Sequence, residues 1–329
     1  FGPDNSFYTE PANSPVSVNF DTVEATSARV YWPAPPAGDG DAAIVVMREA
    51  SAVSATPSDG TEHAFSSVFG SGADLGTSEF VVFRGSGTEV TVTNLQPSTT
   101  DHVAVFYSAG TGSGASGINY RQATPAINNQ ATLAQTEPVL DASTFSSVGA
   151  SSATLGGNIT SDGGDAITSR GTVWNTTGAP ITQNLLAEGG TAISSFSHLR
   201  ESLNTGSQIF FRAYAVNNTG TGYGPDEFFY TEPANSPASA SIDTVSENSF
   251  RIFWPAPPAG DGDAAIVVVS TSAISATPVD GNEHAFSSIY GSGEDLGTSE
   301  FVVYRGSGTE VNVTGLAPDT LYNVAVFYS

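Results

Sequence analysis

The 329-residue sequence contains neither cysteine nor lysine. Without cysteine the chain forms no disulfide and offers no thiolate, and without lysine it forms none of the Lys–Asn isopeptide cross-links known from some surface fibres. No run of about 18 apolar residues occurs, so the sequence predicts no transmembrane helix. Each domain must therefore be stabilised by its own buried core, which a domain of roughly 100 residues can provide.

Positive charge is scarce as well. The nine basic residues are all arginine, against 33 acidic residues, and the formal net charge is −24. Such a field repels nucleic acid, which excludes that class of partner, and it attracts divalent cations. Charged residues make up only 13% of the chain, about half of the usual share. The polar surface must therefore consist largely of Ser, Thr, Asn and Gly.

Long segments of the sequence occur twice. FYTEPANSP at residues 7–15 returns at 229–237, WPAPPAGDGDAAIVV at 32–46 returns at 254–268, and residues 63–90 return almost unchanged at 284–311. The offset changes from 222 (229 − 7) to 221 (284 − 63), so one residue is lost near Ala50. Such self-similarity is typical of tandem modules.

Thr-Glu-Pro occurs at residues 9–11, 136–138 and 231–233. Proline stiffens an extended linker and blocks strand pairing across it, so we place domain joints there. The predicted domains are residues 10–135 (module A), 136–230 (module B) and 231–329 (module A′, truncated before its last strand). Residues 1–9 match residues 223–231 and are interpreted as the last strand of a preceding B-type module. This order indicates a window from a longer alternating array, with strand exchange between chains as the alternative.

Apolar residues alternate with polar ones over short segments. Val16, Val18 and Phe20 share one predicted face, and Val30 and Trp32 share another. No segment shows a helical period. Short alternating strands with regularly spaced turn signals predict an all-β fold of tandem immunoglobulin-like sandwiches.

Three tryptophans are expected in the module cores. Trp32 and Trp254 end equivalent strands, and Trp174 lies in module B. Gly156 and Gly157 stand near the position that tryptophan occupies in module A, so we expect them to make room for the Trp174 indole.

Module A′ resembles a fibronectin type III domain. That family keeps a Trp in its second strand and a Leu-x-Pro-x-Thr-x-Tyr corner, matched here by Trp254, Leu316, Pro318, Thr320 and Tyr322. Module A matches at Trp32, Leu95, Pro97 and Thr99, but Asp101 replaces the corner tyrosine. The resemblance implies that Tyr322 is a structural core residue and leaves the corner hydrogen bond of module A open.

Modules A and B are also similar to modules of very large surface proteins of Bacteroidota, which include gliding adhesins and filaments exported by the type IX secretion system. The resemblance covers essentially the whole chain and implies an extracellular or cell-surface location. It also implies O-glycosylation at Asp-Thr followed by a small or apolar residue. Thr22, Thr244 and Thr320 fit that pattern, although Thr320 is alternatively a buried corner residue.

Motifs of catalysis and zinc binding are missing. His63 and His284 occupy equivalent repeat positions, and no domain brings two histidines to metal-ligand spacing. No Gly-x-Ser-x-Gly motif occurs, and no carboxylate pair is singled out for acid–base work. The sequence therefore predicts a protein that is not an enzyme.

The repeated Gly-Asp-Gly-Asp loop is the one candidate ion site, with Asp39 and Asp41 in module A and Asp261 and Asp263 in module A′. Asp-x-Asp loops with glycine suit calcium, which takes six to eight oxygen ligands. The alternative is that Asp and Gly only form a good turn. Turn formation is favoured because two carboxylates make a poor calcium cage, so no cofactor is expected.

Together these features predict a non-catalytic stalk or filament segment of a large extracellular protein. Its partners would be neighbouring repeats of the same protein, including a homo-oligomeric filament, with no nucleic acid and no membrane insertion. The alternative is an adhesin segment whose loops bind a surface glycan or protein. An enzyme accessory module has less support, since no catalytic domain accompanies it.

Overall fold

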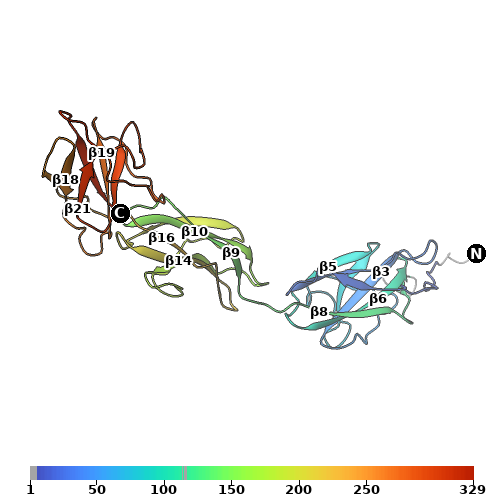
Figure 1. Cartoon of the computed structure of the whole chain (residues 1–329). Helices are drawn as coiled ribbons and strands as arrows, with labels where there is room; N and C mark the ends of the chain where they lie inside the picture. Colours follow the sequence, from blue (N-terminus) through green and yellow to red (C-terminus); the bar gives the residue numbers. More distant parts are fainter. Residues whose placement is uncertain (1–5, 113, 115–116) are drawn as a thin grey trace, which may run out of the picture. The chain divides into compact units, whose positions relative to one another are not determined.

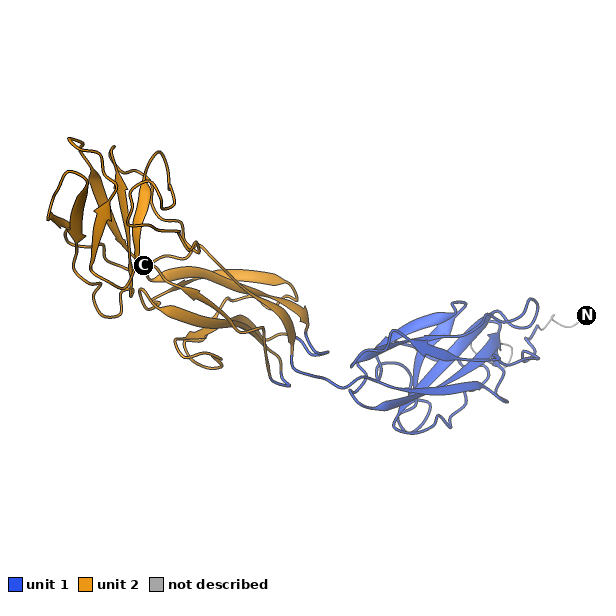
Figure 2. Ribbon diagram, viewed as in Figure 1, with its two compact units in different colours: residues 1–137, 162–166, 218–220 blue, residues 138–161, 167–217, 221–329 orange. Residues whose placement is uncertain are grey.

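The computed structural model describes residues 6–112, 114 and 117–329, and this part contains 22 β-strands and no helix (Figure 1). It divides into two compact units (Figure 2). One comprises Phe1–Glu137, Asp162–Ala166 and Asn218–Gly220, and the other comprises Pro138–Ser161, Ile167–Asn217 and Thr221–Ser329. Within the described residues, no helix meets the length and apolarity of a membrane span. Of the strand expected over residues 1–9, residues 1–5 lie outside the described part and 6–9 carry no strand.

Module A consists of two antiparallel sheets. The first has the order β1-β2-β5, and the second has the order β4-β3-β6-β7, with β8 also pairing with β6. The strands are β1 (Asn19–Asp21), β2 (Ser27–Tyr31), β3 (Ala42–Glu49), β4 (Phe80–Gly85), β5 (Glu89–Thr93), β6 (Thr100–Ala109), β7 (Asn119–Tyr120) and β8 (Ala126–Ala131). The two sheets enclose a core that includes Val30, Trp32, Val45 and Val105. This is an immunoglobulin-like sandwich, as the sequence predicts.

The second sheet of module A is buried on both faces. Ile44 and Val46 of β3 point away from the sandwich core and pack with Phe106, while Val53 and Leu75 of the long β3–β4 connection cover them. Residues 43–47 are therefore all buried. A sheet covered on both sides favours a continuous apolar run over strict alternation, which explains the AAIVV segment.

Module A′ repeats this plan. Its sheets have the orders β17-β18-β21 and β20-β19-β22. The strands are β17 (Ser241–Asp243), β18 (Ser249–Phe253), β19 (Ala265–Ser270), β20 (Phe301–Gly306), β21 (Glu310–Thr314) and β22 (Asn323–Tyr328). Both modules shift register at the same place, between Val45 and Val46 and between Val267 and Val268. The shared pairing confirms that residues 63–90 and 284–311 have the same strand order.

Module B is a third two-sheet module with sheets β13-β10-β9 and β12-β11-β14-β15, where β16 also pairs with β14. Its strands are β9 (Val139–Ser146), β10 (Ser152–Ser161), β11 (Ser169–Asn175), β12 (Leu186–Ala187), β13 (Ser195–Glu201), β14 (Gln208–Val216), β15 (Thr221–Tyr223) and β16 (Glu227–Tyr230). Trp174 packs with Leu155, Ile209 and Phe211 in its core.

The two glycines of module B lie directly against the neighbouring strands. A Cβ on Gly156 would lie 2.1 Å from the carbonyl oxygen of Phe196, and one on Gly157 would lie 2.2 Å from the Ala213 Cβ. The two glycines therefore allow β10 to lie close to β13 and to β14, and the Trp174 indole is not among the nearest atoms.

Candidate functional site: the linker clamp and its neighbours

The repeated proline-rich loop of module A is fixed by its own strands. After Trp32, the Tyr107 hydroxyl of β6 donates hydrogen bonds to the carbonyls of Pro33 at 2.8 Å and Ala34 at 3.1 Å. Gly40 has a positive φ of 94°, and a Cβ there would lie 3.0 Å from the Ser108 carbonyl and 3.3 Å from the Pro11 ring. Only glycine suits that position, since it adopts positive φ without strain and adds no side chain.

This loop holds the linker that enters module A. The Asp39 carboxylate accepts hydrogen bonds from the backbone N–H of Ala12 at 2.5 Å and of Asn13 at 3.0 Å, and a further one from the Asn13 side-chain amide. A charged acceptor makes these bonds stronger than neutral ones. The bond from the Asn13 side chain is the main cause that lowers the pKa of Asp39. We call this contact the linker clamp.

Module A′ has the same clamp. Asp261 accepts hydrogen bonds from the backbone N–H groups of Ala234 and of Asn235, the latter at 3.1 Å, and from the Asn235 side chain at 2.5 Å. Here too the Asn235 side-chain bond is the largest cause that lowers the pKa of the aspartate. The two repeated segments PANSP and GDGD, separate in the sequence, therefore form one structural device.

The second aspartate of each loop makes fewer hydrogen bonds than the first. Asp41 accepts one long hydrogen bond, 3.4 Å, from the backbone N–H of Gly110, and Asp263 is exposed. In module B, Asp162 accepts the Gly164 N–H at 2.9 Å and Asp165 accepts the Asn218 N–H at 2.9 Å. No group of three or more His, Cys, Asp or Glu residues in the described part of the chain is placed to hold a metal ion. That Asp39, Asp41, Asp261 and Asp263 form turns, with calcium binding as the alternative, stays a prediction.

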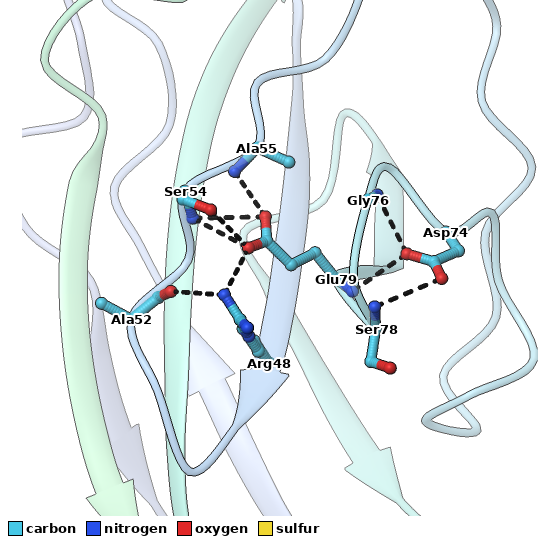
Figure 3. A network of polar contacts seen from close by, with 8 residues as sticks. All are labelled: Arg48, Ala52, Ser54, Ala55, Asp74, Gly76, Ser78 and Glu79. Carbon is cyan, nitrogen blue, oxygen red and sulfur yellow. Dashed lines mark hydrogen bonds and ion pairs between the residues drawn. The ribbon is translucent and has the colours of Figure 1, made fainter.

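A buried carboxylate that the sequence reasoning missed lies at the start of β4. Glu79 accepts hydrogen bonds from the Ser54 N–H at 3.1 Å, the Ser54 hydroxyl at 2.7 Å and the Ala55 N–H, and it forms an ion pair with Arg48 at 2.8 Å (Figure 3). Its side chain is fully buried. Burial raises the pKa of Glu79, but these hydrogen bonds and the Arg48 charge outweigh it, so the pKa lies below its ordinary value. Glu79 thus ties the long β3–β4 connection to the sheet.

Asp74 shapes the turn that leads into Glu79. Its carboxylate accepts the N–H groups of Gly76 at 3.0 Å, Ser78 at 3.3 Å and Glu79 at 3.0 Å (Figure 3). We call the hydrogen bonds of the buried Glu79 carboxylate to Ser54 and Ala55 the glutamate cradle. Module A′ repeats this cradle, with Glu300 accepting from the Ser275 N–H at 3.1 Å and from the Ala276 N–H at 2.7 Å. The signal in the sequence is the unchanged DLGTSEF segment of the two copies.

The fibronectin-like corner differs between the two modules. In module A′ the hydroxyl of the half-buried Tyr322 accepts the backbone N–H of Ala317 at 2.9 Å. In module A the equivalent N–H, that of Gln96, donates to Glu49 at 3.0 Å instead. Asp101 occupies the tyrosine position and is buried. The corner N–H of module A is therefore satisfied by a residue of β3 and not by one of β6.

The three glycosylation candidates are exposed. Thr22 and Thr244 lie directly after β1 and β17, with φ values of 45° and 49°. Their hydroxyls donate only to the preceding aspartates, at 3.3 Å and 3.0 Å. Thr320 donates to the Pro318 carbonyl at 3.0 Å, and the expected alternative of a buried corner residue is wrong for it.

The predicted core residues lie as follows. Trp32, Trp174 and Trp254 are 3%, 7% and 4% exposed. The Trp32 ring packs 5.1 Å from Phe83, and the Trp254 ring packs 5.2 Å from Tyr304. All three indoles belong to module cores.

No known protein family matches the sequence, and no curated protein matches it. Among solved structures, the chain is similar to one described as the crystal structure of chicken CNTN1 FN1-FN3 domains, at 12% identity and a TM-score of 0.29, over 95% of this chain and 92% of that chain. The strand pairing itself identifies the chain as a series of all-β, immunoglobulin-like sandwich modules.

Proposed function

We propose that this chain is a non-catalytic structural segment of a large extracellular surface protein, and that it serves as a stalk or filament. The observation that supports this most is the linker clamp, which occurs at Asp39 and again at Asp261. A clamp fixes the direction in which each A-type module follows its linker. Restricting linker freedom is what a load-bearing array needs, since a flexible joint would let neighbouring modules reorient freely.

The charge of the chain fits this role. A net charge of −24 makes neighbouring modules repel one another at low salt, and salt screens that repulsion beyond about 8 Å at physiological ionic strength. The resemblance to Bacteroidota surface proteins supports an extracellular location, neighbouring repeats as partners and O-glycans at Thr22 and Thr244.

The test measures how freely module A′ moves at its joint. Because the chain has no cysteine, labels can be attached to cysteines introduced at the exposed positions Ser197 and Asn312. We expect Asp261→Asn to broaden the distribution of label distances, because it removes the charge and replaces one of the two acceptor oxygens with an NH2 group that faces other donors. Asp263→Asn, which removes the same charge from the same loop, is the control and should change nothing. Equal distributions in all three proteins would contradict a role of the clamp in the joint.

A second candidate function, the binding of a glycan or protein, is favoured by an aromatic stripe on module B. Phe228 and Tyr230 of β16 are 52% and 65% exposed, and Phe228 packs 5.9 Å from Phe210 of β14. Exposed aromatic patches mark interaction sites more often than bare surface does. Loss of binding to a glycan array or to host cells in Phe228→Ser, with unchanged folding, would favour this function over a purely structural one.

A further inference from the structure

The carboxyl group of Asp101 is buried at one end of the module A core. Asp101 is 1% exposed, and neither of its carboxyl oxygens has a hydrogen-bond partner among the described residues. It shares a face of β6 with the core residues Val103 and Val105. A buried charge without a partner is costly, so the group has a strong tendency to be neutral.

The groups around Asp101 do not neutralise it. Glu49 of β3 and Gln130 of β8 are its direct cross-strand neighbours. Arg48, next to Glu49, bonds to Glu79, while His102 is on the opposite face of β6 because successive side chains of a strand alternate. Glu24, in the turn that contacts Leu133, is exposed. The one charged side chain facing Asp101 is therefore another acid.

The two acids differ in their hydrogen bonds. Glu49 accepts the Gln96 N–H at 3.0 Å, and a carboxylate is the better acceptor. Asp101 accepts nothing, so nothing stabilises its charged form. In module A′ an uncharged Tyr322 stands at this position.

We propose that the attachment of the last strand of module A, β8, depends on the protonation of Asp101: the neutral carboxylic acid is compatible with its buried site, and its ionisation loosens β8. β8 pairs with β6 at Asp101 itself. Just beyond it, the Thr132 hydroxyl donates to the Gln96 carbonyl at 2.6 Å, and the Leu133 N–H donates to the Glu24 carbonyl at 3.1 Å. A buried charge at Asp101, next to these bonds in the strand pairing, weakens the attachment of β8.

The direction of the pH effect follows from proton linkage. Burial, with a smaller contribution from Glu49, raises the pKa of Asp101 from 3.8 to about 7. Between these two values Asp101 binds more protons in the folded module than in the unfolded chain, so its contribution to the stability of module A falls as pH rises from about 4 to 7 and is level above that. Module A′, which lacks the acid, shows no such contribution.

The test uses the full chain and two measurements. The first is the carboxyl carbon shift of Asp101, followed by NMR across pH 3 to 9, with an expected midpoint near 7. The second is amide hydrogen exchange in residues 126–133, corrected for intrinsic rates, in the wild-type chain and in Asp101→Asn. We expect wild-type protection to fall relative to Asp101→Asn by up to about tenfold for each pH unit between 5 and 7.

Glu49→Gln supplies a matched variant, since removing its charge should move the Asp101 midpoint to lower pH. An Asp101 midpoint near 4, or equal pH dependence of β8 protection in wild type and Asp101→Asn, would overturn the proposal. The NMR titration of the wild type decides the matter even if a variant fails to fold.

Discussion

Modules A and A′ share most of their sequence, and the places where they differ separate two kinds of structural role. Both keep the linker clamp and the buried Glu79 or Glu300 cradle. They differ at the fibronectin-like corner, where Tyr322 of module A′ corresponds to Asp101 of module A. The two modules thus hold the linker by the same contacts and keep the backbone hydrogen bonds of the long connection, although Ser270 of module A′ stands where module A has Arg48, the ion-pair partner of Glu79. The end of the core, by contrast, is built in two ways.

The largest expected effect is in the cores, where the same substitution should destabilise both modules equally. We expect Trp32→Ala and Trp254→Ala each to reduce the free energy of unfolding by roughly 3–5 kcal/mol, because each removes a buried aromatic side chain and leaves a cavity. Denaturant unfolding followed by far-UV circular dichroism measures this. A much smaller loss in one module would show that its indole is not part of the core.

The buried Glu79 should contribute to the stability of module A mainly through its hydrogen bonds and only slightly through its ion pair with Arg48, which module A′ lacks. Glu79→Ala leaves the N–H groups of Ser54 and Ala55 without their acceptor, and we expect a loss of about 2–3 kcal/mol. Arg48→Ser, which gives module A the serine found at Ser270, should cost far less, since Glu79 keeps its other bonds. Equal losses for the two variants would mean that the ion pair dominates.

The contribution of the corner hydrogen bond to stability can be measured in module A′. Tyr322→Phe removes the hydroxyl that accepts the Ala317 N–H and should cost about 1 kcal/mol. Thermal unfolding of the variant measures this loss. No change would indicate that solvent satisfies the Ala317 N–H equally well.

The smallest expected effect concerns calcium. Since Asp39 and Asp261 already accept hydrogen bonds from the linker, we expect calcium and a monovalent salt of equal ionic strength to shift the melting temperature alike. A saturable rise that is specific to calcium and is lost in Asp39→Asn/Asp41→Asn would contradict this and favour an ion site.

The sequence predicts the fold well because the fold depends on local patterns. Alternation in Val30 and Trp32, the repeated segments and the turn signals suffice to predict sandwiches with buried tryptophans. Val16 is an exception: it is 90% exposed and precedes β1, because the linker, not a strand, sets its direction. The continuous burial of residues 43–47 also depends on a distant connection that periodicity does not reveal.

The clamp could not be predicted because its partners lie 26 or 27 residues apart. Asp39 alone has the properties of a turn residue or a calcium ligand, and only the structure shows that the Ala12 and Asn13 amides reach it. The departure at Asp101 was visible in the sequence, but the replacement of the tyrosine hydroxyl by Glu49 was not, because Glu49 lies on another strand.

The central claim is that the duplicated acidic loop holds the linker. Amide exchange at Ala234 and Asn235 tests it most directly, in the wild-type chain, in Asp261→Asn and in the charge-matched control Asp263→Asn. The clamp predicts slow exchange at both amides in the wild type and in the control, and faster exchange in Asp261→Asn. Fast exchange of both amides in the wild type, or no acceleration in Asp261→Asn, would contradict the claim.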